Sequence, residues 1–255
     1  MSDNNRILLF TVAMTTVVAL VLGILFFGLK DKHAENEAVF NKRAILTAVG
    51  NYLPTPVDEL SKEQVLGIFE ESITSKVLKE DGTVVEDVDA DDVQLAKEKK
   101  KPEADRNYPL YIYNDGKEDF YILSVYGNGL WDAIWGNIAL KGDGATIAGA
   151  SFDHKGETPG LGAEIKDNKK WSAQFADKRV YDFNGNFTSV IVRKGGAKDP
   201  VYEVDGISGA TVTANGVSEM LKTGIAKYSD YLEKIQKDTP KINAPSDGKM
   251  GMLLN

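Results

Sequence analysis

The sequence contains no cysteine and only two histidines, His33 and His154. The absence of cysteine excludes disulfides, thiolate zinc sites, iron–sulfur clusters ligated by this chain and a cysteine nucleophile. Two histidines cannot form a multi-histidine metal centre, so we expect no bound metal. Basic side chains are also in deficit, with 30 against 38 acidic ones and a formal net charge of −8. An acidic chain lacks the electrostatic footprint of a nucleic-acid-binding protein, so no nucleic-acid partner is expected.

The composition is otherwise that of a folded protein. Apolar residues make up 42 % of the 255 residues, and the 24 glycines and 8 prolines are too few for a low-complexity chain. This length allows one ordinary domain with appendages or two small domains.

One long apolar run, from Ile7 to Leu29, contains no charged side chain. It is long enough to cross a hydrocarbon core of about 30 Å as a helix. A cleaved signal peptide would have a shorter apolar segment followed by a small-x-small site. The run ends instead in FFGLKDKH, so we predict a retained single transmembrane anchor. The span has no ionisable residue of the kind that ion pathways use, so this helix alone is not expected to conduct ions.

The charges that flank this run favour one orientation. Only Arg6 precedes it, whereas Lys30, Lys32, Lys42 and Arg43 follow soon after. By the positive-inside rule, the large C-terminal part would lie in the cytoplasm.

Composition and periodicity divide the chain into four segments. We predict an anchor over 1–30, a helical and hairpin region with an exposed charged insertion over 31–107, a compact domain over 108–240 and a flexible tail over 241–255. Helices are expected over 33–52, 60–73 and 213–235. Hairpins are expected to turn at 81–82 and 114–116, and further strands to lie at 145–154, 179–183, 188–196 and 201–204. Because these elements show no βαβ period, the predicted fold class is α+β.

The segment YEVDGISGATVTANGV has the pattern of strand, glycine-containing turn and helix start. Backbone N–H groups at a helix start favour an anion, and Gly209 removes a side chain that would block its approach. The same residue types also serve as ordinary turn and N-cap residues. The turn matches neither the Rossmann fingerprint nor the Walker A loop.

The heptapeptide from Asp205 to Thr211, DGISGAT, resembles the D-x-x-(S/T)-G-A-T flavinylation motif of covalent FMN-binding domains. The segments GNGLWDAIWGNIAL, GASFDHKGETPGLGAEI and DGISGATVTANGV also follow one another as in a known family. That family is the C subunits of the sodium-translocating NADH:quinone reductases. The resemblance covers nearly the whole chain and is weakest over about 87–107.

The resemblance implies a cofactor and its attachment site. FMN would be bound covalently as a phosphoester of Thr211, with Thr213 as the one close competitor. A separate flavin transferase would attach it from FAD, and Asp205 would serve in recognition of that enzyme. The remaining candidate cofactor-binding residues lie in the motif and in the GETPGLG loop; they are Ser208, Gly209, Ala210, Glu157, Thr158, Gly160, Leu161 and Gly162. No catalytic acid–base residue is expected in an electron carrier.

Several of these residues have a plain structural alternative. The GETPGLG loop is equally well interpreted as a rigid turn, and His154 as a hydrogen-bonded structural residue. Trp131 and Trp135 are more simply core or subunit-interface residues than stacking partners of a flavin.

The resemblance also implies a role and a location. The chain would relay electrons from NADH toward ubiquinone or menaquinone inside a sodium-pumping complex, beside the other subunits. It would sit in the inner membrane with its soluble domain in the periplasm, against the count of flanking charges. The alternatives are the G-type flavin subunit of the Rnf ferredoxin:NAD complex and a non-redox membrane-anchored scaffold.

Overall fold

The computed structural model describes residues 2–238, which form two compact units divided between Asn41 and Lys42. The α-helices are α1 (Asp3–Ala48), α2 (Lys62–Ser72), α3 (Leu95–Glu98), α4 (Glu164–Asp167), α5 (Lys169–Ala173), α6 (Thr211–Ala226) and α7 (Ser229–Asp238). The strands are β1 (Ile73–Leu78), β2 (Val84–Val85), β3 (Tyr108–Asn114), β4 (Asp119–Asn128), β5 (Ala133–Leu140), β6 (Ile147–His154), β7 (Ile191–Arg193) and β8 (Glu203–Asp205). Short 3₁₀ helices are η1 (Gly50–Tyr52), η2 (Val57–Glu59), η3 (Ala90–Asp92) and η4 (Glu103–Asp105).

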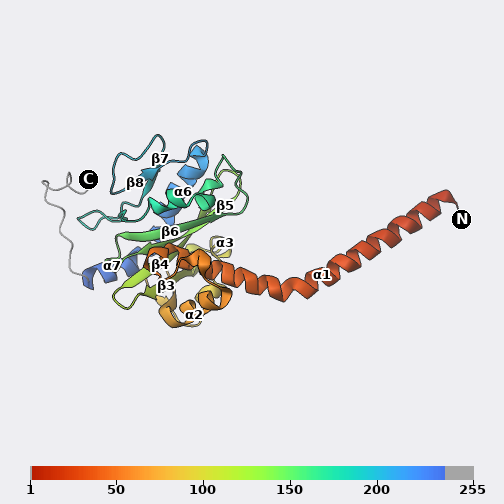
Figure 1. Cartoon of the computed structure of the whole chain (residues 1–255), viewed down its shortest axis with the longest axis horizontal. Helices are drawn as coiled ribbons and strands as arrows, with labels where there is room; N and C mark the ends of the chain where they lie inside the picture. Colours follow the sequence, from red (N-terminus) through yellow and green to blue (C-terminus); the bar gives the residue numbers. More distant parts are fainter. Residues whose placement is uncertain (1, 239–255) are drawn as a thin grey trace. The chain divides into compact units, whose positions relative to one another are not determined.

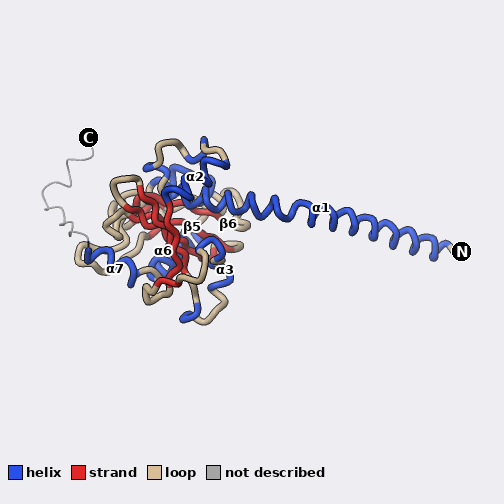
Figure 2. The backbone as a smooth tube through the Cα atoms, turned by 90° about the horizontal axis from the view of Figure 1, so that it is seen from below, coloured by secondary structure: helices blue, strands red, loops and turns tan. Residues whose placement is uncertain are grey.

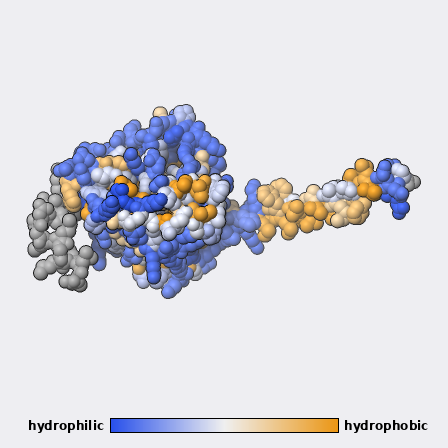
Figure 3. Space-filling view, turned by 90° about the horizontal axis from the view of Figure 1, so that it is seen from above, coloured by the Kyte–Doolittle hydropathy of each residue, from blue (hydrophilic) through white to orange (hydrophobic). Residues whose placement is uncertain are grey.

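The first unit consists of most of α1. Among the described residues, α1 is the one helix that is long and apolar enough to cross a membrane. Its apolar side chains between Ile7 and Leu29 are exposed, and hydrophilic residues bound this band at both ends (Figure 3). The hydroxyls of Thr11, Thr15 and Thr16 donate to carbonyls one turn earlier, so these polar groups find their partners within the helix itself.

The second unit is built on a six-stranded antiparallel sheet with the order β2-β1-β3-β4-β5-β6. Figure 2 shows its strands gathered at the centre of the unit, with helices around them. Both predicted hairpins are confirmed: β1 pairs with β2 across Asp81-Gly82, and β3 pairs with β4 across 114–116. Because β1 pairs with β3, residues 73–85 belong to the same sheet as the strands that follow.

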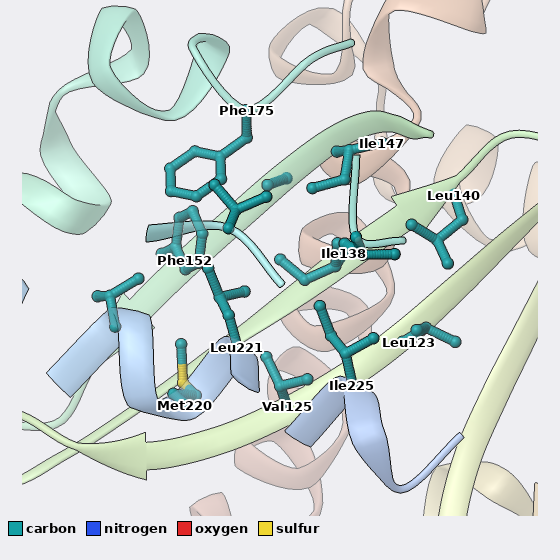
Figure 4. Close-up of a cluster of buried hydrophobic side chains, with 14 of the residues drawn as sticks. Leu123, Val125, Ile138, Leu140, Ile147, Phe152, Phe175, Met220, Leu221 and Ile225 are labelled. Carbon is teal, nitrogen blue, oxygen red and sulfur yellow. The ribbon is translucent and has the colours of Figure 1, made fainter. Parts of the chain in front are cut away.

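Each face of the sheet is covered by different helices, with α6 on one side and α2 on the other (Figure 1). The α6 face holds the main hydrophobic core, where Leu221 and Ile225 point toward Val125 and Ile138 of the strands (Figure 4). On the opposite face the last turns of α1 pack against β6, and Ser151 Oγ donates to the Ala44 carbonyl at 2.7 Å.

A second, two-stranded sheet carries the segment before α6. Its strands β7 and β8 are parallel, and β8 leads directly into the glycine-containing turn. Antiparallel and parallel sheets with separate helices make an α+β fold, as predicted.

The predicted helix over 213–235 is wrong in extent, because the structure has two helices that meet at Lys227 and Tyr228. Tyr228 is fully buried, and its hydroxyl lies 2.9 Å from both the Pro109 and Ser124 carbonyls. Anchoring this side chain in the sheet interrupts a helical pattern that is continuous in the sequence.

Three other predictions need correction. The helix expected over 33–52 ends at Ala48, and 3₁₀ turn η1 follows it. Residues 179–183 form isolated bridges rather than a strand, because Asp182 accepts the N–H groups of Asn184 and Asn186 and closes a loop. The charged insertion is not wholly exposed: Glu98 is buried and accepts a hydrogen bond from the Asn107 N–H at 2.9 Å. The predicted tail, 241–255, lies outside the described residues.

Candidate functional site

The DGISGAT turn is held in place by two neighbouring segments, which are α5 with its C-cap residue Gln174 and the loop that contains Ala197. The side chain of Gln174 accepts the Asp205 N–H at 3.0 Å, and the indole N–H of Trp171 donates to the Asp205 carbonyl at 2.7 Å. The Asp205 carboxylate itself accepts the Ala197 N–H at 2.8 Å. The backbone at the start of the motif is therefore fixed from outside, by residues with no sequence signal that connects them to it.

The helix after this turn starts at Thr211, two residues earlier than the pattern predicts. Its N-cap is Ala210, which offers no capping side chain, and its first turn contains no acidic residue. Ala214 is the first residue whose N–H reaches a carbonyl of the preceding turn, that of Ala210 at 2.9 Å. Alanine is among the poorest N-cap residues, so the start of this 16-residue helix is left open to an external acceptor.

Gly209 joins the turn to the GETPGLG loop. Its φ is +81°, a conformation that L side chains rarely adopt, and a Cβ there would lie 2.5 Å from the Gly160 carbonyl oxygen. Only glycine allows this close approach. Two segments about 50 residues apart in the sequence are thus brought together beside Thr211.

The two candidate acceptor threonines have opposite environments. Thr213 is completely buried, and its hydroxyl donates to the Glu157 carboxylate at 2.7 Å. Thr211 is half-buried, at the rim of the helix start, beside exposed Ser208 and Gly209. Of the two hydroxyls, that of Thr211 is open to a reagent from solution.

Glu157 lies inside this region and not on its surface. Its side chain is 5 % exposed. Besides the Thr213 hydroxyl, its oxygens accept the backbone N–H groups of Leu130, Trp131 and Asp132 at 2.9–3.3 Å. These hydrogen bonds hold the pKa of the carboxyl below its usual range, although burial by itself raises that pKa.

The rest of the GETPGLG loop forms a compact turn. The Thr158 carbonyl accepts the Leu161 N–H at 2.9 Å, and the Glu164 carboxylate accepts the N–H groups of Gly160 and Gly162. The Nδ1 atom of His154 accepts the Glu157 N–H at 3.1 Å, which is the structural role expected for this histidine.

Exposed apolar side chains lie on the segments that meet around Thr211. Trp131 is 65 % exposed and therefore no core residue, while Trp135 is half-buried. The other exposed apolar side chains on these segments are those of Leu130, Leu161 and Val212. Leu161, one of the predicted cofactor-binding residues, thus lies among other exposed apolar side chains, of which Leu130 and Val212 were not singled out from the sequence.

A cavity of about 610 Å³ runs along α6 from Val212 to Lys227. Its other walls come from residues of β4 and from the charged insertion, including Lys99 and Arg106. The insertion thus lines a hollow that begins one residue after Thr211.

This arrangement fits a phosphate group linked to Thr211. The N–H groups of the first turn of α6 and the positive end of the helix dipole favour an anion. Gly209 allows the GETPGLG loop to approach the turn closely, and no acidic side chain of the first turn of α6 competes with an anion. The Thr213 hydroxyl, by contrast, would have to leave the interior to react.

The chain is similar to known proteins. Residues 129–226 match the family model described as FMN-binding domain. The C subunit of the Na(+)-translocating NADH-quinone reductase from Pseudomonas aeruginosa is 34 % identical over 89 % of this chain and 95 % of its own length. Its counterpart from Vibrio anguillarum is 28 % identical over 92 % of this chain and 98 % of its own.

Solved structures show the same likeness. The crystal structure of the C subunit from Parabacteroides distasonis is 33 % identical, with a TM-score of 0.70 over 80 % of this chain and 96 % of that one. The Shewanella oneidensis NqrC structure, at 24 % identity, shares the fold with a TM-score of 0.67 over 79 % of this chain and 99 % of that one.

Proposed function

This chain belongs to the family of C subunits of the Na(+)-translocating NADH-quinone reductase, and on that premise we propose that it carries FMN as a phosphoester of Thr211. As a member of this family it is a flavoprotein subunit of the complex. The observation that carries the covalent assignment is the contrast between the accessible Thr211 hydroxyl, at an uncapped helix start, and the buried, hydrogen-bonded Thr213.

The residues present supply binding and placement. FMN, when bound, supplies one- and two-electron redox chemistry that no side chain of this protein offers. The first turn of α6 stabilises the negative charge that a phosphodiester retains. The exposed side chains of Leu130, Trp131, Leu161 and Val212 offer apolar surface next to the linkage. Ser208, Gly209 and Gly160 are small, exposed residues of the turn and of the loop beside it.

Attachment requires a separate enzyme. A threonine hydroxyl is a weak nucleophile, and the buried carboxylate of Glu157 is hydrogen-bonded to Thr213 rather than to Thr211. With FAD as donor, Thr211 Oγ1 forms a bond to the phosphorus of the FMN half. The bond from that phosphorus to the AMP half breaks, AMP leaves and the hydroxyl proton is released. We assign this step to a flavin transferase that recognises the DGISGAT turn.

Within the assembly the chain relays electrons that enter from NADH and leave toward a quinone, while the complex moves sodium. Its partners are the other subunits, and α1 anchors it in the inner membrane. We place the soluble domain in the periplasm, where the transferase acts. Flanking charge favours the opposite orientation, but a large domain translocates largely regardless of a few such charges.

Covalent flavin is tested by replacing each threonine separately. Membranes from cells with an active transferase should give a fluorescent band under denaturing electrophoresis for the wild type and for Thr213→Val. The band should disappear for Thr211→Val, which keeps the side-chain volume but removes the hydroxyl. Peptide mass mapping should place the FMN mass on the peptide that contains Thr211.

Two results would contradict the proposal. A Thr211→Val band as bright as that of the wild type would show that the acceptor is elsewhere. A wild-type chain of unmodified mass, despite an active transferase, would leave a non-redox membrane-anchored scaffold. Co-purified subunits separate the quinone reductase from an Rnf-type complex.

A further inference from the structure

The buried Glu157 carboxylate is a common acceptor for two of the segments that surround the attachment site. Its Oε1 atom accepts the N–H groups of Trp131 and Asp132 at 2.9 and 3.3 Å. Its Oε2 atom accepts the Leu130 N–H at 3.3 Å and the Thr213 hydroxyl at 2.7 Å. Glu157 itself lies on the GETPGLG loop, so one side chain links three parts of the chain.

The backbone around this carboxylate is shaped to fit it. A Cβ at Gly129 would lie 2.6 Å from Oε1, and a Cβ at Gly162 would lie 2.6 Å from Oε2. Any side chain at either glycine would displace the carboxylate. The 129–132 loop and the GETPGLG loop therefore fit closely around a charged group. A loop that served only as a rigid turn would not need this fit.

The charge is held by hydrogen bonds alone. In the described part of the chain, the interactions of the Glu157 carboxylate are hydrogen bonds, and no lysine, arginine or histidine forms an ion pair with it. A buried anion without a counter-charge is stable only while its acceptor sites are filled. Removing the charge would therefore loosen the 129–132 loop and the first turn of α6 together.

We propose that Glu157 is a positioning residue for flavin attachment, because its carboxylate fastens the 129–132 loop and the GETPGLG loop to the first turn of α6. This inference rests on the proposed attachment at Thr211. Thr211 stands two residues before Thr213 in the same helical turn. Its hydroxyl and the N–H groups beside it are consequently presented in one fixed geometry to the transferase.

The first test uses the unmodified chain and does not depend on the flavin. Hydrogen–deuterium exchange of Glu157→Gln should become faster at amides 130–132 and at the start of α6, since the carboxamide cannot accept from all four donors. The matched control is Glu98→Gln, which changes another buried carboxylate that accepts a backbone N–H, that of Asn107 at 2.9 Å. Its effect should stay within the charged insertion.

The second test measures the rate of flavin incorporation with purified transferase and FAD at a temperature where circular dichroism shows each variant folded. Glu157→Gln should lower the turnover rate about tenfold, because small displacements of a reacting group have large kinetic costs. It should still reach full modification at Thr211. Thr213→Val, which removes one of the four donors, should fall between the wild type and Glu157→Gln.

Three outcomes would overturn the inference. These are unchanged exchange at 130–132 in Glu157→Gln, an unchanged rate of incorporation, and an equal loss of rate in Glu98→Gln, which would indicate general destabilisation. Each of them is distinct from failure of the proposed function, in which the wild-type chain itself takes up no flavin.

Discussion

Single residues at the attachment site act mainly through backbone geometry. Gly209 and Gly185 have similar left-handed conformations, with φ of +81° and +88°. They differ in their surroundings, because a Cβ at Gly209 would meet the Gly160 carbonyl whereas none of the described atoms lies within 4 Å of one at Gly185. Comparing alanine variants of these two glycines therefore distinguishes the cost of the backbone conformation from the cost of a steric clash.

We expect Gly185→Ala to lower the free energy of unfolding by about 1 kcal/mol, the usual cost of a left-handed alanine. Gly209→Ala should cost more, because the GETPGLG loop must also move. Urea titration of both variants measures the difference, and flavin fluorescence should fall for Gly209→Ala alone. Equal free energies of unfolding for the two variants would contradict the contact between Gly209 and Gly160.

At the scale of elements, the pair β7–β8 depends on one carboxylate. Glu203 of β8 forms an ion pair with Arg193 of β7 and accepts the N–H groups of Lys198 and Asp199 in the connecting loop. The Arg193 side chain, followed by these N–H groups, lowers the pKa of Glu203 to about 2. The strand that leads into the DGISGAT turn is thereby tied to β7 and to the loop between the two strands.

This lowered pKa predicts that the free energy of unfolding depends on pH. The pKa of Glu203 is lower in the folded chain than its ordinary value of 4.5, so its contribution to stability is complete above about pH 4.5 and is lost as the pH falls toward 2. Other carboxyls titrate there too, so the quantity to measure is the difference in unfolding free energy between the wild type and Glu203→Gln. That difference should shrink from about pH 6 to about pH 3. A constant difference would contradict the predicted coupling.

For the whole molecule, orientation in the membrane can be tested with cysteine, because the chain has none of its own. Lys117 lies exposed at the tip of the β3–β4 hairpin, and Ser2 precedes the apolar run. An impermeant thiol reagent added to intact cells, with the outer membrane permeabilised, should label Lys117→Cys but leave Ser2→Cys unlabelled until lysis. The reverse pattern would place the soluble domain in the cytoplasm, as the flanking charges suggest.

Local patterns in the sequence predicted much of the fold. The uncharged run from Ile7 to Leu29 has the composition and length of a membrane-spanning helix. The turn residues at 81–82 and 114–116 predicted both hairpins. This was possible because the conformation of a tight turn depends on residues that are consecutive in the sequence. The break at Tyr228 could not be predicted in this way, since the carbonyls that anchor its hydroxyl belong to distant strands.

For the attachment site, too, the sequence determined one part and the tertiary structure another. The sequence by itself determined the anchor, the α+β class, the family and the two candidate threonines, because these depend on composition, local pattern and motif. Only the tertiary structure placed Thr213 in the interior against Glu157 and left Thr211 at an uncapped helix start. The reason is physical: accessibility and hydrogen bonding depend on which distant segments meet, and here they meet through a carboxylate 56 residues from its hydroxyl partner.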